Sequence, residues 1–360
     1  MIGGPDSGKE RFVVLDGMRG VAALAVITDH VASPLMQAAV PGRYLAVDFF
    51  FVLSGFVLAH VYLARLASGA MSAGAFMRVR IARFAPLYLA ALLLGAALAV
   101  LYAMRGWQDH TLPHVVASAA FGLFMAPTPP ALSIWPDAPF PLNGPTWSLF
   151  FELLINAVFA VAALRWLKPA VVGLIAVIAG LIYIPVVFHY GQSDPGFAWS
   201  NFLGGFPRVT FMFFAGVWLY QMRDRWKLPV LPAWAAYALL AAVLMTPAQG
   251  VWRPVFDLVA AWVIFPALVL LAAETPVRGG VRRISAFMGL VSYGVYVLHV
   301  PLWGWLRLVL ERLAGGPDPL PGVVNVALVA VIAVAAAAVL NAVYDVPLRR
   351  WLSGRRRRAP

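Results

Sequence analysis

"VVLDGMRGVAALAVITDH", residues 13–30, has the length of a membrane-spanning helix and yet carries four ionisable side chains. These residues would rise about 27 Å as an α-helix, close to the ~30 Å hydrocarbon core of a bilayer. Asp16, Arg19, Asp29 and His30 interrupt the apolar stretch. Charges are costly in lipid, so ionisable groups inside a span predict a functional site.

The composition extends this interpretation to the whole chain of 360 residues, of which 62% are hydrophobic and only 12% are charged. Soluble domains are about 45–50% apolar and about 25% charged, so this composition predicts an integral membrane protein. The apolar runs are about 20 residues long and lack the alternation of a membrane β-barrel. We therefore predict an all-α polytopic membrane protein.

The apolar runs predict about ten spans with both termini in the cytoplasm. Their ranges are 12–33, 44–64, 84–104, 146–164, 170–188, 206–222, 230–246, 255–273, 284–308 and 322–343. Most of the 27 Lys and Arg residues then fall on inner segments, as expected for a membrane protein. The net charge of +12 therefore reports topology, and no nucleic acid partner is expected.

A single membrane domain is expected over residues 1–345, followed by a basic cytoplasmic tail over 346–360. Residues 111–126 are too short to span and predict a re-entrant or interfacial helix. The chain has no cysteine, which excludes a thiolate nucleophile and a Cys-based zinc site. We expect no metal and no permanently bound cofactor, so a base or nucleophile must come from His, Ser or carboxylates.

Helix geometry places Arg19 and His30 on one face, because eleven residues differ by about 20° from three full turns and by about 16 Å in height. Asp16 can pair with Arg19, whereas Asp29 points elsewhere and has no predicted role. The alternative is a structural Asp16 and Arg19 pair with His30 hydrogen-bonded to a neighbouring helix. A functional His30 is favoured.

"VDFFFVLSGF" opens the second span with Asp48, which is expected near the level of His30. An aspartate there can fix the tautomer of the histidine and stabilise its protonated form. The alternative is charge stabilisation of the helix N-terminus. Ser54 and Gly55 favour close helix packing over catalysis.

"RVRIARFAPLYL" places Arg80 and Arg83 on one helix face at the predicted inner boundary. An arginine pair suits a phosphate-bearing ligand, and plain anchoring at the inner surface is the alternative. "PTWSLFFELLIN" gives a stripe of Ser148, Glu152 and Asn156 on one face. Its buried glutamate is either a base, a ligand for a sugar hydroxyl, or an interhelical hydrogen-bonding group.

"SYGVYVLHVPL" places Ser292, Tyr296 and His299 on one face of the ninth span. A second intramembrane histidine on the outer side favours function over packing. No role is predicted for three further histidines, His60, His110 and His114.

These segments together resemble acyltransferase family 3, whose pattern includes an N-terminal LDGxRGxAAxxV run with Arg-x10-His. "LDGMRGVAALAV", "VDFFFVLSGF", the Arg-x-x-Arg pair, "PTWSL" and "SYGVYVLH" recur in family order across nearly all of the chain. One departure is that the family often reads WSLSxEExFY, whereas "WSLFFELLIN" leaves Glu152 as its only carboxylate.

The resemblance implies transfer of an acyl group, most often acetyl from acetyl-CoA, to a hydroxyl of a saccharide or glycolipid at a bacterial cytoplasmic (inner) membrane. Acyl-CoA, the acceptor and the lipid bilayer are the expected partners. The predicted site residues are His30, Arg19, Glu152 and Asp48 for catalysis, Arg80 and Arg83 for acyl-CoA, and Trp147, Ser148, Tyr296 and His299 for substrate.

The predicted topology puts His30, Asp48, Glu152 and His299 toward the outside and the paired arginines inside. Acyl-CoA would then dock its phosphates inside and thread its pantetheine arm between helices. The histidine would act as a general base or carry the acyl group itself. The alternative function is a transporter or flippase without chemistry, which the lack of paired internal repeats disfavours.

Overall fold

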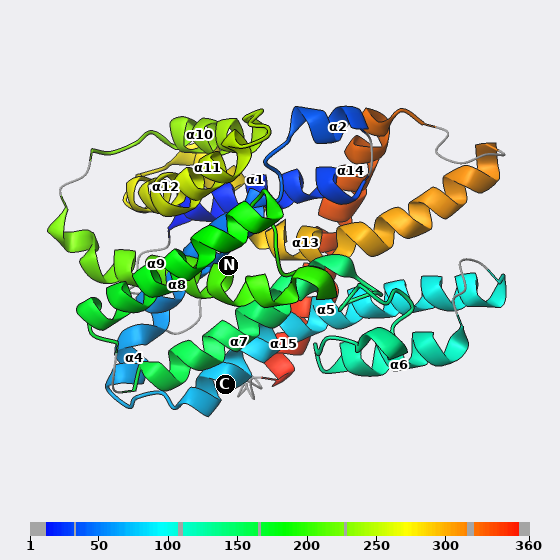
Figure 1. Cartoon of the computed structure of the whole chain (residues 1–360), viewed down its shortest axis with the longest axis horizontal. Helices are drawn as coiled ribbons and strands as arrows, with labels where there is room; N and C mark the ends of the chain where they lie inside the picture. The colour runs from blue at the N-terminus through cyan, green and yellow to red at the C-terminus, as the bar shows by residue number, and fades with distance from the viewer. Residues whose placement is uncertain are drawn as a thin grey trace, which may run out of the picture.

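The computed structural model describes residues 12–31, 34–106, 111–164, 167–226, 229–314 and 320–352. Within these ranges every regular element is helical and no strand occurs. The helices pack side by side into one bundle (Figure 1). The predicted all-α membrane fold is confirmed.

The described residues form fifteen α-helices. They are α1 Val13–His30, α2 Pro34–Ala39, α3 Leu45–Leu58, α4 Ala64–Ala67, α5 Ala73–Met104, α6 Leu112–Leu123, α7 Trp147–Ala162, α8 Pro169–Tyr190, α9 Gly205–Met222, α10 Ala233–Met245, α11 Trp252–Val259, α12 Phe265–Ala273, α13 Gly279–Ala314, α14 Gly322–Leu340 and α15 Val346–Leu352. Three π-helical turns, Ala59–Leu63, Ala260–Ile264 and Asn341–Asp345, join α3 to α4, α11 to α12 and α14 to α15.

Each of the ten predicted spans falls on a helix. Eight helical stretches of the described chain are long and apolar enough to cross a membrane by themselves. The other two predicted spans are α1, which is 18 residues long but charged, and α10, which has 13 residues. The predicted interfacial segment forms α6. The last span continues as helix to Leu352, past the predicted start of the tail, and the side of the membrane on which the termini lie stays a prediction.

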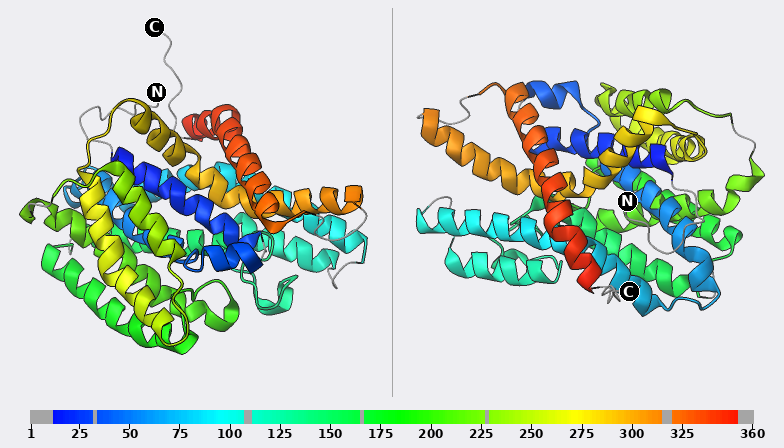
Figure 2. Two further views of the ribbon diagram at one scale, coloured as in Figure 1. Left: turned by 90° about the horizontal axis from the view of Figure 1, so that it is seen from above. Right: turned by 180° about the vertical axis from the view of Figure 1, so that it is seen from behind.

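The packing brings the first and ninth predicted spans together. α1 packs along α13, which in turn contacts α5 and α14, while α3 packs against α9 and α9 against α8. Seen from behind, α14 and α15 cross over α13 and α5 (Figure 2). A small apolar cluster that includes Ala23, Ile27, Val291 and Val329 fastens α1, α13 and α14 together. The polar faces of α1 and α13 therefore meet inside the bundle.

The close approach of α3 and α9 depends on two glycines. A Cβ added to Gly55 would lie 1.9 Å from the carbonyl oxygen of Phe213, and one added to Gly216 would lie 2.0 Å from that of Val52. Real carbon atoms do not approach a backbone oxygen so closely, and neither backbone can give way without separating the helices. The prediction that Gly55 permits close helix packing is confirmed.

Gly55→Ala is therefore expected to destabilise the protein by roughly 1–3 kcal/mol, the usual cost of overpacking. Thermal denaturation in detergent, followed by loss of the monodisperse peak on size-exclusion chromatography, measures the change. Gly74→Ala is the matched control, because a Cβ at Gly74 in α5 meets nothing within 4 Å. Alanine favours helix over glycine, so the control should be neutral or slightly stabilising. Equal stability of the two variants would contradict the packing argument.

Candidate functional site

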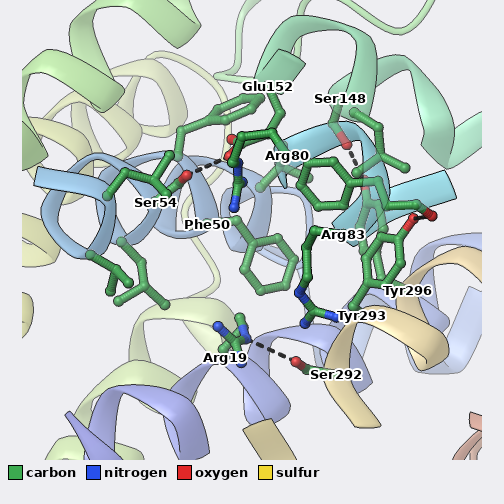
Figure 3. Close-up of a pocket in the computed structure, with 17 residues that line it drawn as sticks. Arg19, Phe50, Ser54, Arg80, Arg83, Ser148, Glu152, Ser292, Tyr293 and Tyr296 are labelled. Carbon is green, nitrogen blue, oxygen red and sulfur yellow. Dashed lines mark hydrogen bonds and ion pairs between the residues drawn. The ribbon is translucent and has the colours of Figure 1, made fainter. Parts of the chain in front are cut away.

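A cavity that opens to the solvent lies between α1, α3, α5, α7 and α13, with about 830 Å³ of empty space that includes part of the open solvent (Figure 3). Its wall is mostly apolar, with polar groups contributed by each of the five helices. The lining residues are Arg19, Val47, Phe50, Phe51, Leu53, Ser54, Val57, Leu58, Arg80, Arg83, Phe84, Ser148, Leu149, Glu152, Ser292, Tyr293 and Tyr296. Many of the predicted site residues thus converge on one space, although they are far apart in the sequence.

Arg19 is held at the cavity wall by α13. Its Nε donates to Ser292 Oγ at 2.9 Å, and one terminal nitrogen donates to the carbonyl oxygen of Gly289 at 2.7 Å. The same nitrogen lies 3.0 Å from Asp16 Oδ1, which confirms the predicted pair within α1. α13 can come this close because Gly289 has no side chain. A Cβ added there would lie 2.5 Å from the Asp16 side chain, which is too close for real carbon atoms. The arginine is therefore fixed by partners on two helices.

Glu152 on α7 meets Arg80 on α5 inside the cavity. One terminal nitrogen of Arg80 lies 3.0 Å from Glu152 Oε1, and the hydroxyl of Ser54 donates to the same oxygen. Asn156 Nδ2 reaches it more weakly, at 3.5 Å. The glutamate is 8% exposed, so its charge is compensated by partners rather than by water.

This contact corrects one prediction and adds to another. Arg80 and Glu152 do not lie on opposite sides of the membrane domain, since they form an ion pair. The reason is that α5 begins at Ala73, eleven residues before the predicted start of the third span, so Arg80 lies well inside the helix. Ser54 also does more than permit packing, because it binds the glutamate and lines the cavity.

Arg83 adds a third guanidinium group to the wall. Its nearest carboxylate oxygen is Asp345 Oδ2 at 3.9 Å, which is too long for a hydrogen bond, and the group stacks over the Tyr293 ring at 5.5 Å. Asp345 is fully buried, and its carboxylate also accepts hydrogen bonds from Arg349 and Asn341. No role was predicted for Asp345, because only the fold brings the C-terminal helix under α5. The contact was therefore missed by the sequence analysis.

The cavity wall has more positive than negative groups. Its lining holds the three guanidinium groups of Arg19, Arg80 and Arg83 and a single carboxylate, that of Glu152. Each guanidinium has five N–H donors, more than its carboxylate partner can accept. The buried Nε of Arg80 has no hydrogen-bond partner among the described residues. The wall can therefore accept an anionic group such as a phosphate.

Ser148 and Tyr296 close one end of the cavity by binding each other. Ser148 Oγ and the Tyr296 hydroxyl are 2.7 Å apart, and each lies 3.0 Å from the carbonyl oxygen of Pro145. Each hydroxyl has one hydrogen, so one of them donates to its neighbour and the other donates to this carbonyl oxygen. Phe50 packs edge-on against the tyrosine, with ring centroids 5.6 Å apart. These contacts bring together two residues that the sequence predicted as substrate contacts.

His30 and His299 form a pair beyond Tyr296. Nε2 of His299 lies 3.2 Å from Nδ1 of His30, and the two rings meet edge to face. The Tyr296 and His299 ring centroids are 6.2 Å apart, so the pair adjoins the cavity end although neither histidine lines the cavity. His299 is fully buried, whereas His30 is partly exposed. The structure thus places His299 beside the predicted catalytic residue, with no open path of its own to a substrate.

Asp48 has other partners than the predicted one. Its carboxylate accepts hydrogen bonds from Nε and a terminal nitrogen of Arg208, at 2.6 and 3.0 Å, and from the hydroxyl of Ser193 at 3.0 Å. Both charged side chains are almost completely buried. The hypothesis that Asp48 orients His30 is therefore wrong. A buried aspartate needs a counter-charge, and Arg208 on α9 supplies it.

One further predicted site residue, and several residues without a predicted role, do not line the cavity. Trp147 does not line it and instead packs under the guanidinium group of Arg208, 5.3 Å from its ring centroid. Asp29, which had no predicted role, forms an ion pair with Arg43 at 2.6 Å. Of the histidines without a predicted role, His60 lies in the π-helical turn after α3 and packs against two aromatic rings. The side chain of His114 is hydrogen-bonded to that of Thr111. His110 lies outside the described residues.

Comparison with known proteins gives two matches. The acyltransferase 3 family model, described as "Acyltransferase domain", matches residues 12–342. "Protein 2 in picA locus" from Rhizobium radiobacter is 42% identical over 165 residues, which are 44% of this chain and 83% of that protein. No solved structure matches the chain. The family match spans all five helices that line the cavity.

Proposed function

This chain belongs to the acyltransferase 3 family and is a membrane acyltransferase, and we propose that it moves an acetyl group from acetyl-CoA to a hydroxyl of a saccharide or glycolipid. The acceptor would lie on the extracytoplasmic side of a bacterial inner membrane. One observation carries the proposal: a cavity with three guanidinium groups and apolar walls ends beside a pair of histidines.

The cavity suits the donor because acyl-CoA combines phosphates with a long, weakly polar arm and an acyl thioester. Arg80 and Arg83 would take phosphate oxygens, and the ion pair with Glu152 would hold Arg80 in position for this contact. The apolar wall would take the arm as it extends toward Tyr296. Arg19 lies three helical turns before His30 on α1, so it would contact the donor between its phosphates and its thioester.

His30 supplies the chemistry in this proposal. Its imidazole would take the proton of the acceptor hydroxyl as the oxygen attacks the thioester carbonyl and the carbon–sulfur bond breaks. The same proton would then pass to the departing CoA thiolate. An acyl-histidine intermediate is the alternative route, in which the imidazole itself attacks the carbonyl and the acceptor oxygen displaces it in a second step.

Arg83→Gln is expected to raise the KM for acetyl-CoA by about 10-fold or more, because it removes a charge that is worth 1.5–3 kcal/mol when it binds an anion. The rate of acyl transfer as a function of acetyl-CoA concentration measures this effect. Arg78→Gln is the matched control, since Arg78 is an exposed arginine on the same helix and does not line the cavity. A similar KM in both variants would contradict donor binding at the arginines.

The proposed reaction is tested by incubating the purified protein in detergent with radiolabelled acetyl-CoA and measuring release of free CoA, with and without an acceptor extract of envelope saccharide. Release that depends on the protein, and label found in the saccharide, are the expected results. Binding of acetyl-CoA without release would point to another acceptor class. Neither binding nor release would reject acyl-CoA as the donor and return attention to transport of an acylated substrate.

A further inference from the structure

The contacts of the two paired histidines determine where their protons lie. Nδ1 of His299 is 3.1 Å from the carbonyl oxygen of Val295, and Nδ1 of His30 is 3.1 Å from that of Val26. A carbonyl oxygen only accepts hydrogen bonds, so each Nδ1 must carry a hydrogen to make its contact. A neutral imidazole has one N–H, which leaves both Nε2 atoms as acceptors.

The hydrogen bond between the two rings can then have only one donor. The Nδ1–H of His30 is shared between the Val26 oxygen and Nε2 of His299, which is 3.2 Å away. In the opposite arrangement His299 would donate from Nε2, and each bare Nδ1 would face a carbonyl oxygen as one lone pair against another. That arrangement satisfies one contact and makes two repulsive ones. His299 is therefore the acceptor, and Nε2 of His30 carries an unshared lone pair.

We propose that His299 is a positioning residue for His30: its Nε2 accepts the Nδ1–H of His30, fixes, together with the Val26 carbonyl, the tautomer whose Nε2 is basic, and stabilises the imidazolium that forms during the reaction. This inference rests on the proposed function of His30 in acyl transfer. The lone pair on His30 Nε2 takes the proton of the acceptor hydroxyl, while the Nδ1–H stays in its hydrogen bond to His299. The Nε2 proton then leaves with the CoA thiolate, which restores the starting state.

The surroundings explain why a neutral ring serves here and a carboxylate does not. His299 is fully buried, so an aspartate in its place would be a desolvated charge without a partner. Asp29, the acidic residue that precedes His30 in the sequence, is already paired with Arg43. The groups that fix His299 itself are the Val295 carbonyl and the packing of the α13 helix, which do not change charge during the reaction. The histidine pair can thus hold its geometry in the absence of substrate.

Nitrogen NMR of the wild-type protein tests this assignment without any acyl donor. With ¹⁵N-labelled histidine at about pH 8, where a free imidazole is neutral, protonated and bare ring nitrogens have well-separated shifts. We expect His30 and His299 each to show a protonated Nδ1 and a bare Nε2. The signals are assigned by their loss in the His30→Gln and His299→Gln variants. A protonated Nε2 on His30 would overturn the proposal, whatever the enzyme does.

Kinetics of two variants at one position test the role in the reaction. His299→Leu removes the acceptor but keeps an apolar side chain of similar size, and it should lower kcat by about 10²-fold while the KM for acetyl-CoA stays within about 2-fold, as for other residues that orient a reacting group. His299→Gln can still accept through its side-chain oxygen and should retain at least about a tenth of the wild-type kcat.

Trp305→Phe is the matched control, because it removes a different hydrogen bond of α13, from Trp305 Nε1 to Leu94, and leaves the histidine pair untouched. It should keep the wild-type kcat. Equal losses in His299→Leu and His299→Gln would reject the positioning role and indicate a purely structural one. Wild-type protein that shows the expected tautomer but no acyl transfer would reject the proposed function and leave the proton assignment standing.

Discussion

Replacing His30 by alanine is expected to reduce acyl transfer by about 10³-fold or more, because the change removes the base or nucleophile on either proposed route. The side chain is partly exposed at the end of α1 and contacts His299 only at its edge, so the fold should survive. Release of CoA from radiolabelled acetyl-CoA by purified wild type and variant measures the effect, with thermal stability recorded on the same samples.

His189→Ala is the control for this experiment. His189 is an exposed histidine at the end of α8 and does not line the cavity, so its removal should leave the rate unchanged. Undiminished transfer by a stable His30→Ala variant would reject both the general base and the acyl-histidine route. Equal losses in both histidine variants would instead indicate a general effect on folding or solubility.

Asp48→Ala is expected to destabilise the protein by about 3–5 kcal/mol, the usual cost of leaving one member of a buried ion pair alone. Arg208 is 1% exposed and binds both oxygens of the carboxylate, so its charge would have no water to compensate it. We expect little monodisperse protein after purification and a large drop in the temperature at which the remaining protein aggregates. Any loss of acyl transfer in this variant should follow from its loss of stability.

Two further variants separate this cause from a general sensitivity of the chain. Asp224→Ala removes the partner of Arg223, where the aspartate side chain is 80% exposed, and should change stability by less than about 1 kcal/mol. A double variant, Asp48→Leu with Arg208→Met, removes both charges and keeps apolar volume, so it should recover most of the stability. A double variant as unstable as Asp48→Ala would show that the ion pair is not the reason.

The features that the sequence predicted correctly are those set by local geometry. The helical period placed Ser292, Tyr296 and His299 on one face of α13, and they do contact Arg19, Ser148 and His30 in turn. The spacing of three residues predicted the pair of Asp16 and Arg19 within α1. The runs of apolar residues predicted the helices themselves, because only helices and closed β-barrels satisfy the backbone in lipid and runs of about 20 residues have the length of helical spans.

The ion pairs between distant helices could not be predicted in this way. Arg80 meets Glu152, Arg83 faces Asp345, and Arg208 binds Asp48, over separations that no periodicity encodes. The sequence analysis assigned Arg80 and Arg83 to acyl-CoA or to anchoring at the inner surface, so their partners were not sought inside the bundle. A rule that each buried carboxylate requires a cation would have raised the question for Asp48, but only the packing of α3 against α9 answers it.

The attachment of Arg19 to α13 sets an order of events during synthesis. Its hydrogen-bond acceptor Ser292 follows it by 273 residues, so at about 5–20 residues per second it is made about 14–55 seconds later. Until then the arginine has Asp16, three residues before it on the same helix, as an ion-pair partner. The first described helix is thus completed by one of the latest, and a truncated nascent chain that stops before α13 lacks the contacts of α1 with α13 and keeps those with α3, α10 and α12.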